Sequence, residues 1–318
     1  MEERYCELGD VCLCFEEFGA DRGGEPLLLI MGLGAPMIAW PVGFCEQLVE
    51  AGFDVIRFDN RDVGRSTVLH HAGVPRRRDT LAGRKVAARY SLSEMARDAV
   101  GLLDHMGFKK AHVVGASMGG MIAQVLAIEH PDRVLSLTSI MSTTGRKTVG
   151  RPHPGALRMM AKEPPTGMGI EAEIDHFVQF FRSVGSKGSL FEEDVIRALA
   201  EEALTRGSTR AGTMRQLAAI TTTPDRTRAL RRLKVPSLVI HGTADRLVHV
   251  SGGRATARAL PGSTYLEFAD MGHDLPSALW PQMVAAISSL ARSAPAPSGP
   301  ARPEIEDVIP PGPAQVVS

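Results

Sequence analysis

Three segments of the sequence contain residue types that could together make a serine hydroxyl reactive. Gly115-Ala116-Ser117-Met118-Gly119 fits the pattern G-x-S-x-G, in which a serine occupies a sharp turn between a strand and a helix. Asp245 and His273 follow it along the chain. A serine hydroxyl attacks a carbonyl only when a base removes its proton, and a carboxylate must orient that base. The predicted chemistry is nucleophilic catalysis, with Ser117 as nucleophile, His273 as base and Asp245 as the orienting acid.

The residues on either side of Ser117 predict the strand and the helix that this turn requires. Ala111 to Val114 form a short β-rich run, and from Gly120 onward apolar residues recur at helical spacing. A strand that reverses into a helix so abruptly strains its central residue and leaves no space for side chains two positions before and after it. Glycines occupy both of those positions. We therefore expect the Ser117 hydroxyl to stand clear of the backbone at the start of the helix.

Asp245 and His273 are each expected just beyond the C-terminal end of a strand. The strand at 237–240 precedes Asp245, and the strand at 264–268 precedes His273. In open α/β sheets, ligands gather at the carboxyl ends of the strands. The three side chains are therefore expected to meet at one edge of a sheet.

Other acids and histidines are weaker candidates for these roles. Residues 141–144, which follow the next strand after the Ser117 helix, contain no carboxylate. His241 at a strand end and His249 in a loop are rival bases, and both are expected to be structural or solvated. Asp270 and Asp274 flank His273 and are expected to form a turn.

Two backbone N–H groups are needed to stabilise the negative charge that develops on the attacked carbonyl oxygen. One is expected from Met118, directly after the nucleophile, and the other from Leu33, in the loop after the third strand. The alternative is that Gly32 and Gly34 only permit a tight turn there.

The order of the predicted elements indicates an α/β fold with a mostly parallel, twisted sheet. Residues 4–8 and 11–18 predict an antiparallel hairpin at the N-terminus. Helices then alternate with strands; one of them opens with the capping box Ser91-Leu92-Ser93-Glu94. This alternation implies helices on both faces of the sheet.

From about residue 141 the alternation stops, and four helical segments are predicted near 155–160, 169–184, 191–205 and 210–220. We predict an α/β core domain at 1–140 and 227–293, a helical cap insertion at 141–226, and a disordered, Pro-, Ala- and Gly-rich tail at 294–318. Internal packing and an apolar substrate pocket are the two alternatives for the large apolar residues of the insertion: Met159, Met160, Met168, Phe177, Phe180, Phe181 and Met214.

The composition of the 318-residue chain limits its partners and its location. Its formal net charge of +0 argues against nucleic acid as a partner. The N-terminus has no basic and apolar leader and no apolar run long enough to cross a bilayer, so we expect a cytoplasmic protein without integral membrane association. The hairpin register puts Cys6 on the opposite face from Cys12 and Cys14, which predicts reduced thiols.

These motifs together resemble the α/β hydrolase superfamily of serine esterases. Residues 27–34 (LLLIMGLG) and 57–67 (RFDNRDVGRST) are similar to a narrower group, that of aclacinomycin methylesterase and mycobacterial esterases and lipases. Ser, Asp, His is the order of the catalytic residues in this fold. Many relatives have His-Gly where this chain has Met31-Gly32, so the substrate is not inferred from that loop.

The resemblance and the residues lead to the same expected activity. This is hydrolysis of small to medium apolar carboxylic esters through an acyl-enzyme, with a small-molecule substrate, no cofactor and no metal. The same three residues would also support a thioesterase, a lactonase, a carbon-carbon bond hydrolase or a lipase, and a ligand receptor on a hydrolase fold is an alternative of another class. The sequence leaves the oligomeric state open.

Overall fold

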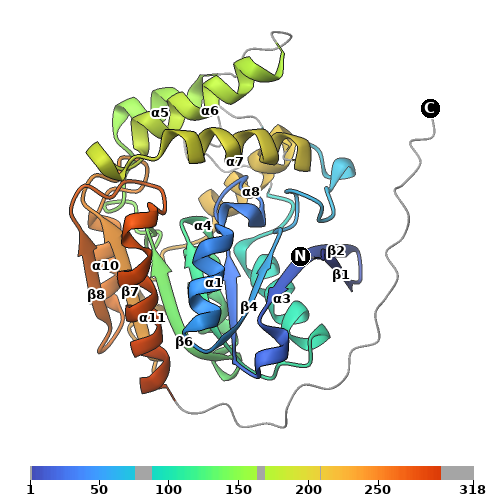
Figure 1. Ribbon diagram of the computed structural model, residues 1–318, viewed down its shortest axis with the longest axis vertical. Coiled ribbons are helices and arrows are strands. Elements are labelled where there is room, and N and C mark those ends of the chain that lie inside the picture. The colour runs from blue at the N-terminus through green and yellow to red at the C-terminus, as the bar shows by residue number, and fades with distance from the viewer. Residues whose placement is uncertain (1, 76–87, 163–168, 208, 295–318) are drawn as a thin grey trace.

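A central sheet organises the molecule (Figure 1). Within the residues that the computed structural model describes, 2–75, 88–162, 169–207 and 209–294, it has eight strands in the spatial order β1-β2-β4-β3-β5-β6-β7-β8. The strands are β1 Arg4–Leu8, β2 Val11–Phe18, β3 Glu25–Ile30, β4 Phe53–Phe58, β5 Ala111–Ala116, β6 Val134–Ile140, β7 Ser237–Gly242 and β8 Thr264–Phe268. The first two strand pairs, β1 with β2 and β2 with β4, are antiparallel, and the remaining pairs are parallel. The predicted fold class is confirmed.

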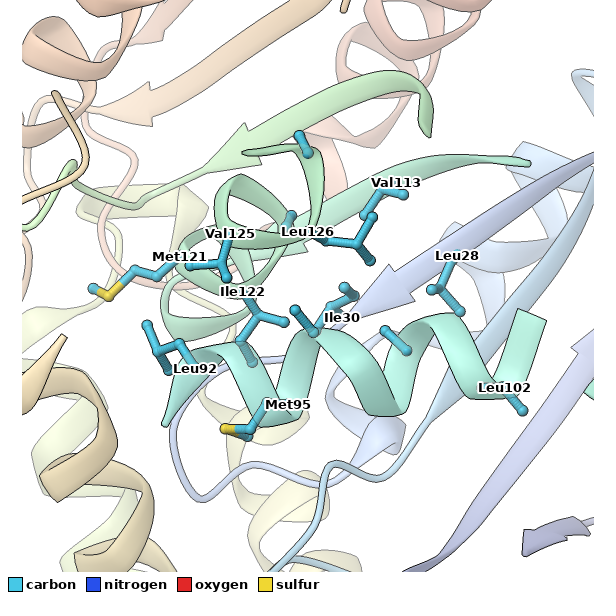
Figure 2. Close-up of a cluster of buried hydrophobic side chains, with 14 of the residues drawn as sticks. Leu28, Ile30, Leu92, Met95, Leu102, Val113, Met121, Ile122, Val125 and Leu126 are labelled. Atoms are coloured by element: carbon cyan, nitrogen blue, oxygen red, sulfur yellow. The ribbon is translucent and has the colours of Figure 1, made fainter. Parts of the chain in front are cut away.

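Helices cover both faces of the sheet because the buried strands alternate their side chains between two apolar clusters. On β3, Leu28 and Ile30 pack against α3 and α4, as Figure 2 shows, whereas Leu27 and Leu29 pack against α1 and α11. The helices of the sheet region are α1 Val42–Glu50, α3 Leu92–His105, α4 Met118–Glu129, α10 Ser251–Ala259 and α11 Trp280–Ser293.

The predicted local signals at the hairpin and at α3 are present. In the hairpin, Cys6 pairs with Leu13, and all four cysteines are free thiols. At the start of α3 the Ser93 N–H donates to Ser91 Oγ at 3.2 Å, and the Ser91 N–H donates to Glu94 Oε2 at 2.7 Å. The capping box therefore fixes where α3 begins.

Between β6 and β7 the chain leaves the sheet for a run of helices. They are α5 Pro154–Ala161, α6 Ile170–Val184, α7 Glu193–Arg206, α8 Arg210–Thr222 and the short α9 Thr227–Leu230, which the sequence pattern did not predict. In Figure 1, α5, α6 and α7 lie above one end of the sheet. A small apolar cluster of their own joins α6 to α7, built on Ile174, Val178, Ile196 and Ala200.

Two buried ion pairs fasten these helices to the turn that follows β4. Arg206, the last residue of α7, lies with Nη2 2.9 Å from Asp59 Oδ2, and Arg215 on α8 lies with Nη2 2.6 Å from Asp62 Oδ1. The four side chains are nearly inaccessible to solvent. Ion pairs shielded from water are screened little by salt, so these two contacts between the helices and the turn after β4 should persist at high salt.

Membrane-spanning helices are absent from the described part of the chain, where no helix is both long enough and apolar enough to cross a bilayer. The predicted disordered tail lies outside the described residues, apart from Ala294.

Candidate active site

Ser117 occupies the sharp turn between β5 and α4. Its backbone angles, φ 55° and ψ −117°, lie in a region that residues other than glycine rarely adopt. Two hydrogen bonds hold this conformation: the Ser117 N–H donates to Ile140 O at 2.9 Å, and Ser142 Oγ donates to Ser117 O at 2.8 Å. The neighbouring strand β6 and the residues after it therefore support the strained turn.

The two glycines of the motif are required by the close approach of backbone. A Cβ atom on Gly115 would lie 2.2 Å from Gly119 O, and one on Gly119 would lie 1.9 Å from Ile30 O. Both distances are far below van der Waals contact, so any larger residue would separate α4 from the sheet. The steric reason expected from the sequence agrees with this geometry.

Ser117, His273 and Asp245, which are far apart in the sequence, lie in one line of contacts. His273 Nε2 is 2.9 Å from Ser117 Oγ, and His273 Nδ1 is 2.7 Å from Asp245 Oδ2. An ionised carboxylate can only accept, so Nδ1 carries the proton that is donated to Asp245. In the neutral ring Nε2 then has a free lone pair, which is directed at the serine hydroxyl.

The environment of Asp245 keeps its carboxylate ionised. Burial alone raises the pKa of Asp245, but the charge of His273 and the hydrogen bonds from His241 and His273 outweigh it and hold the pKa at about 2. Its other oxygen, Oδ1, accepts the N–H groups of Leu247 and Val248, each at 2.8 Å. The carboxylate is fixed on all sides, and it can hold His273 in one tautomer.

The two expected N–H donors border the serine. Met118 is the first residue of α4, and the first N–H groups of a helix have no partner within the helix. The loop carrying Leu33 passes close to the nucleophile, since a Cβ on Gly32 would lie 3.1 Å from Ser117 Cβ. Among the described residues, none accepts a hydrogen bond from the Leu33 amide. Both amides are thus free to bind an anionic oxygen beside Ser117.

Three buried side chains hold the Leu33 loop in place. Asn60 Nδ2 donates to Met31 O at 3.0 Å, Asp59 Oδ1 accepts the Met37 N–H at 2.6 Å, and Gln216 Oε1 accepts the Gly34 N–H at 2.8 Å. Sequence reasoning did not identify Gln216. No short motif surrounds it, and its partner is 182 positions away in the chain.

The rival residues have structural roles. His241 is fully buried, donates from Nε2 to Val248 O at 2.8 Å, and lies 3.3 Å from Asp245 Oδ2, so it supports the loop that carries Asp245. Asp270 has φ 59° and forms the expected turn. Asp274 differs from the expectation: its carboxylate accepts the N–H of Ser186, at 3.0 Å, and the Ser186 hydroxyl. Asp274, which is half-buried, therefore binds the chain that follows α6.

The aromatic residues of the insertion contact one another. The Phe177 and Phe181 ring centroids are 4.9 Å apart, and both side chains pack on the apolar cluster shared by α6 and α7. Met214 is buried, and Met159 and Met160 are partly exposed, while Met168 lies outside the described residues. For Phe177 and Phe181 the geometry agrees with internal packing.

Comparisons with known proteins agree with this architecture. Residues 25–276 match the family model of the alpha/beta hydrolase fold, so the chain belongs to the α/β hydrolase family. Rhodomycin D methylesterase DauP of Streptomyces sp. (strain C5) is 32% identical over 316 residues, covering 92% of this chain and 99% of that protein. Rhodomycin D methylesterase DnrP of Streptomyces peucetius is also 32% identical, and the match covers 92% of this chain and 99% of that protein. The prediction of an esterase-type α/β hydrolase is confirmed.

Solved structures share the fold at lower identity. A thermophilic esterase from Thermogutta terrifontis superposes with a TM-score of 0.69 at 24% identity, covering 92% of this chain and 99% of that one. An enol-lactonase from Burkholderia xenovorans LB400 gives a TM-score of 0.69 at 21% identity, covering 91% and 99%.

Proposed function

We propose that this protein is a serine carboxylic ester hydrolase in which Ser117, His273 and Asp245 form a catalytic triad. The observation that supports this most directly is the unbroken contact from Ser117 Oγ through the His273 ring to Asp245, with 2.9 Å and 2.7 Å between the bonded atoms. The strained backbone of Ser117 supports it further, because such conformations cluster at functional sites.

The geometry suggests the following order of steps. Ser117 Oγ attacks the ester carbonyl while His273 Nε2 takes the hydroxyl proton, and Asp245 stabilises the imidazolium that forms. The amides of Leu33 and Met118 bind the oxyanion of the tetrahedral intermediate. His273 then returns the proton to the leaving alcohol, which gives an acyl-enzyme. A water molecule, deprotonated by His273, releases the acid and restores Ser117.

We propose small to medium apolar esters as substrates, with the helices at 141–226 acting as a cap over the core formed by 1–140 and 227–293. Figure 1 supports this placement, since α5, α6 and α7 lie over one end of the sheet. Because two relatives are named methylesterases, methyl esters are the first alkyl esters to test. We place the activity in the cytoplasm.

The decisive variant is Ser117→Ala, assayed with a p-nitrophenyl ester. Removing a triad nucleophile lowers kcat by about 10⁶-fold in a serine hydrolase of this kind. Ser288→Ala is the matched control, because Ser288 is a buried serine on α11 whose hydroxyl donates to Val284 O in its own helix. Retained turnover in folded Ser117→Ala would refute the proposed nucleophile.

A series of p-nitrophenyl esters of increasing acyl length distinguishes the alternatives. Best turnover of short or medium acyl chains supports the proposed substrates, and a jump in rate above the solubility limit would indicate a lipase. A burst of product followed by almost no turnover would indicate a receptor that retains its acyl group.

A further inference from the structure

A cavity lies beside the loop that carries Asp245, and of its lining residues the proposed esterase mechanism uses only Asp245. Its volume is about 440 Å³. Five basic or imidazole side chains line it: Arg151, His153, Lys187, Arg246 and His249. They come from three separate segments, namely the chain before α5, the chain after α6 and the loop between β7 and α10.

Several other arginines of the described chain are matched by acids, unlike the cations of this cavity. Arg57 pairs with Glu16, Arg61 with Asp98, Arg215 with Asp62 and Arg254 with Glu267. By contrast, no described residue forms an ion pair with the side chains of Lys187 or Arg246. Arg151 donates its Nε to Lys147 O, a neutral carbonyl, at 2.6 Å. Three positive charges therefore line one cavity, and none of the three forms an ion pair with a described acid.

The one acid among the described residues of the lining, Asp245, offsets at most one of the three positive charges and forms no ion pair with them. Asp245 accepts the Leu247 and Val248 amides at Oδ1 and His273 at Oδ2, so both of its oxygens are already occupied. Asp270 is nearby, but it reaches the cavity residues through its backbone: its carbonyl accepts the Lys187 N–H at 2.8 Å, and its N–H donates to Thr243 Oγ1 at 3.2 Å. The cavity consequently has a positive potential.

Both imidazoles have Nε2 available as a hydrogen-bond donor. His153 Nδ1 accepts the Gly155 N–H at 3.2 Å, and His249 Nδ1 accepts the Ser251 N–H at 3.3 Å. With Nδ1 accepting, the proton of each neutral ring resides on Nε2. These bonds also place the two rings at the first residues of α5 and α10, where the positive end of the helix dipole adds to the attraction for an anion.

We propose that this cavity binds a phosphate-bearing small molecule through Arg151, Lys187 and Arg246, with the Nε2–H groups of His153 and His249 as further donors. Guanidinium groups present paired N–H donors that match the geometry of phosphate oxygens. A doubly charged phosphate also compensates more of the positive charge of these three side chains than a singly charged carboxylate does. A cavity of about 440 Å³ has room for a phosphate together with the group that it esterifies. The lining includes neither Ser117 nor the Leu33 loop and shares only Asp245 with the ester site, so the two sites would be separate.

The test is calorimetric titration of the whole chain with pyrophosphate at constant ionic strength, in buffer without phosphate or sulfate. We expect saturable binding at one site per chain with a Kd of about 1 mM or tighter. Arg246→Gln and Lys187→Gln should each weaken this binding at least tenfold. Arg258→Gln is the charge-matched control, since Arg258 is an exposed arginine on α10 outside the cavity lining. Absence of saturation, or equal weakening in Arg246→Gln and Arg258→Gln, would overturn the proposal.

Two further titrations separate this site from the ester site and identify the source of the phosphate. Ser117→Ala should bind pyrophosphate as the unaltered protein does, and loss of binding in that variant would show that the anion occupies the ester site instead. Titration with AMP and with inorganic phosphate compares an esterified phosphate with the free ion. Tighter binding of AMP supports a phosphomonoester ligand, and tighter binding of inorganic phosphate supports free phosphate as the ligand of the same cavity.

Discussion

Ser186 and Asp274 join the helical insertion to the loop that carries His273. The Ser186 N–H lies 3.0 Å from both carboxylate oxygens of Asp274, and the Ser186 hydroxyl donates to the same carboxylate. Ser186 Oγ also accepts the Gly272 N–H at 2.9 Å, and the His273 N–H donates to Val184 O at 2.9 Å. The chain after α6 therefore helps to position the His273 imidazole. A movement of the helical insertion relative to the sheet would displace the proposed base.

Ser186→Ala is expected to lower kcat about tenfold with little change in KM. The substitution leaves the buried Gly272 N–H without its acceptor and the Asp274 carboxylate without one donor, and such losses cost about 1–3 kcal/mol. Loss of these hydrogen bonds lets the His273 ring move out of line with Ser117. The chemical step then slows, while substrate binding does not change. Steady-state kinetics on a p-nitrophenyl ester measures both constants.

Ser183→Ala is the control for this prediction. Ser183 lies near the end of α6, three residues before Ser186, and its hydroxyl donates to Phe180 O at 2.7 Å, so the substitution removes a hydrogen bond that does not reach His273. If both variants change kcat and thermal stability alike, Ser186 is only structural.

Gln216 is expected to act through the Leu33 loop. Its Oε1 accepts the Gly34 N–H and its Nε2 donates to Arg61 O, each at 2.8 Å, and the side chain is fully buried. Gln216→Met keeps the shape but removes both bonds. We expect kcat to fall about tenfold, because one poorly placed oxyanion donor costs about 1–3 kcal/mol of transition-state binding.

A trifluoromethyl ketone inhibitor separates the two possible causes of that fall. Its hemiketal oxyanion would bind to the proposed donors, the Leu33 and Met118 amides, so Gln216→Met should weaken its binding as much as it lowers kcat. Gln47→Met on α1, a partly exposed position remote from the loop, is the control. Undiminished inhibitor affinity in Gln216→Met would contradict the assigned role.

The parts of the site that the sequence predicted are those with local causes. The elbow could be predicted because steric rules at a strand-to-helix turn require glycine at positions 115 and 119, and a Cβ at either position would indeed overlap backbone. Asp245 and His273 could be proposed because each follows a strand that the residue pattern predicted.

The supporting residues had no such local signal. Ser186 and Asp274 are 88 positions apart, and Ser186 lies in a short loop between helices that could equally have been solvated. Arg206 and Arg215 are typical of exposed helix positions, yet both are buried against Asp59 and Asp62. Their roles depend on how the insertion docks on the core, which is tertiary information that neither periodicity nor a motif contains.

Arg215→Met is expected to destabilise the fold by about 3 kcal/mol. The substitution leaves the buried Asp62 carboxylate with the Tyr90 hydroxyl and the Leu69 N–H, each at 2.8 Å, but with no cation. Removing one partner of a buried ion pair is costly because the remaining charge stays desolvated. Urea denaturation measures the loss, and Arg254→Met, which breaks an exposed pair with Glu267, should cost far less.

A second substitution tests the cause. Asp62 has φ 70°, a conformation that asparagine adopts readily, so Asp62→Asn removes the charge without straining the turn. The double variant should regain about 1 kcal/mol or more relative to Arg215→Met. A double variant that is less stable still would show that lost packing, not the unpaired charge, dominates.

Asp245 should make the stability of the protein depend on pH below about 4. Its pKa is about 2 in the folded protein against an ordinary value of 3.8, so the folded state binds the proton less readily than the unfolded chain does. The resulting stabilisation, about 2 kcal/mol, is fully present above pH 3.8 and is lost as the pH falls through 2.

Asp245→Asn cannot titrate. The free energy of unfolding that this variant lacks relative to the unaltered protein should therefore be about 2 kcal/mol larger at pH 6 than at pH 2. Urea titrations at both pH values measure it, with Asp132→Asn at an exposed position as control; a deficit that does not change with pH would show that Asp245 carries no depressed pKa.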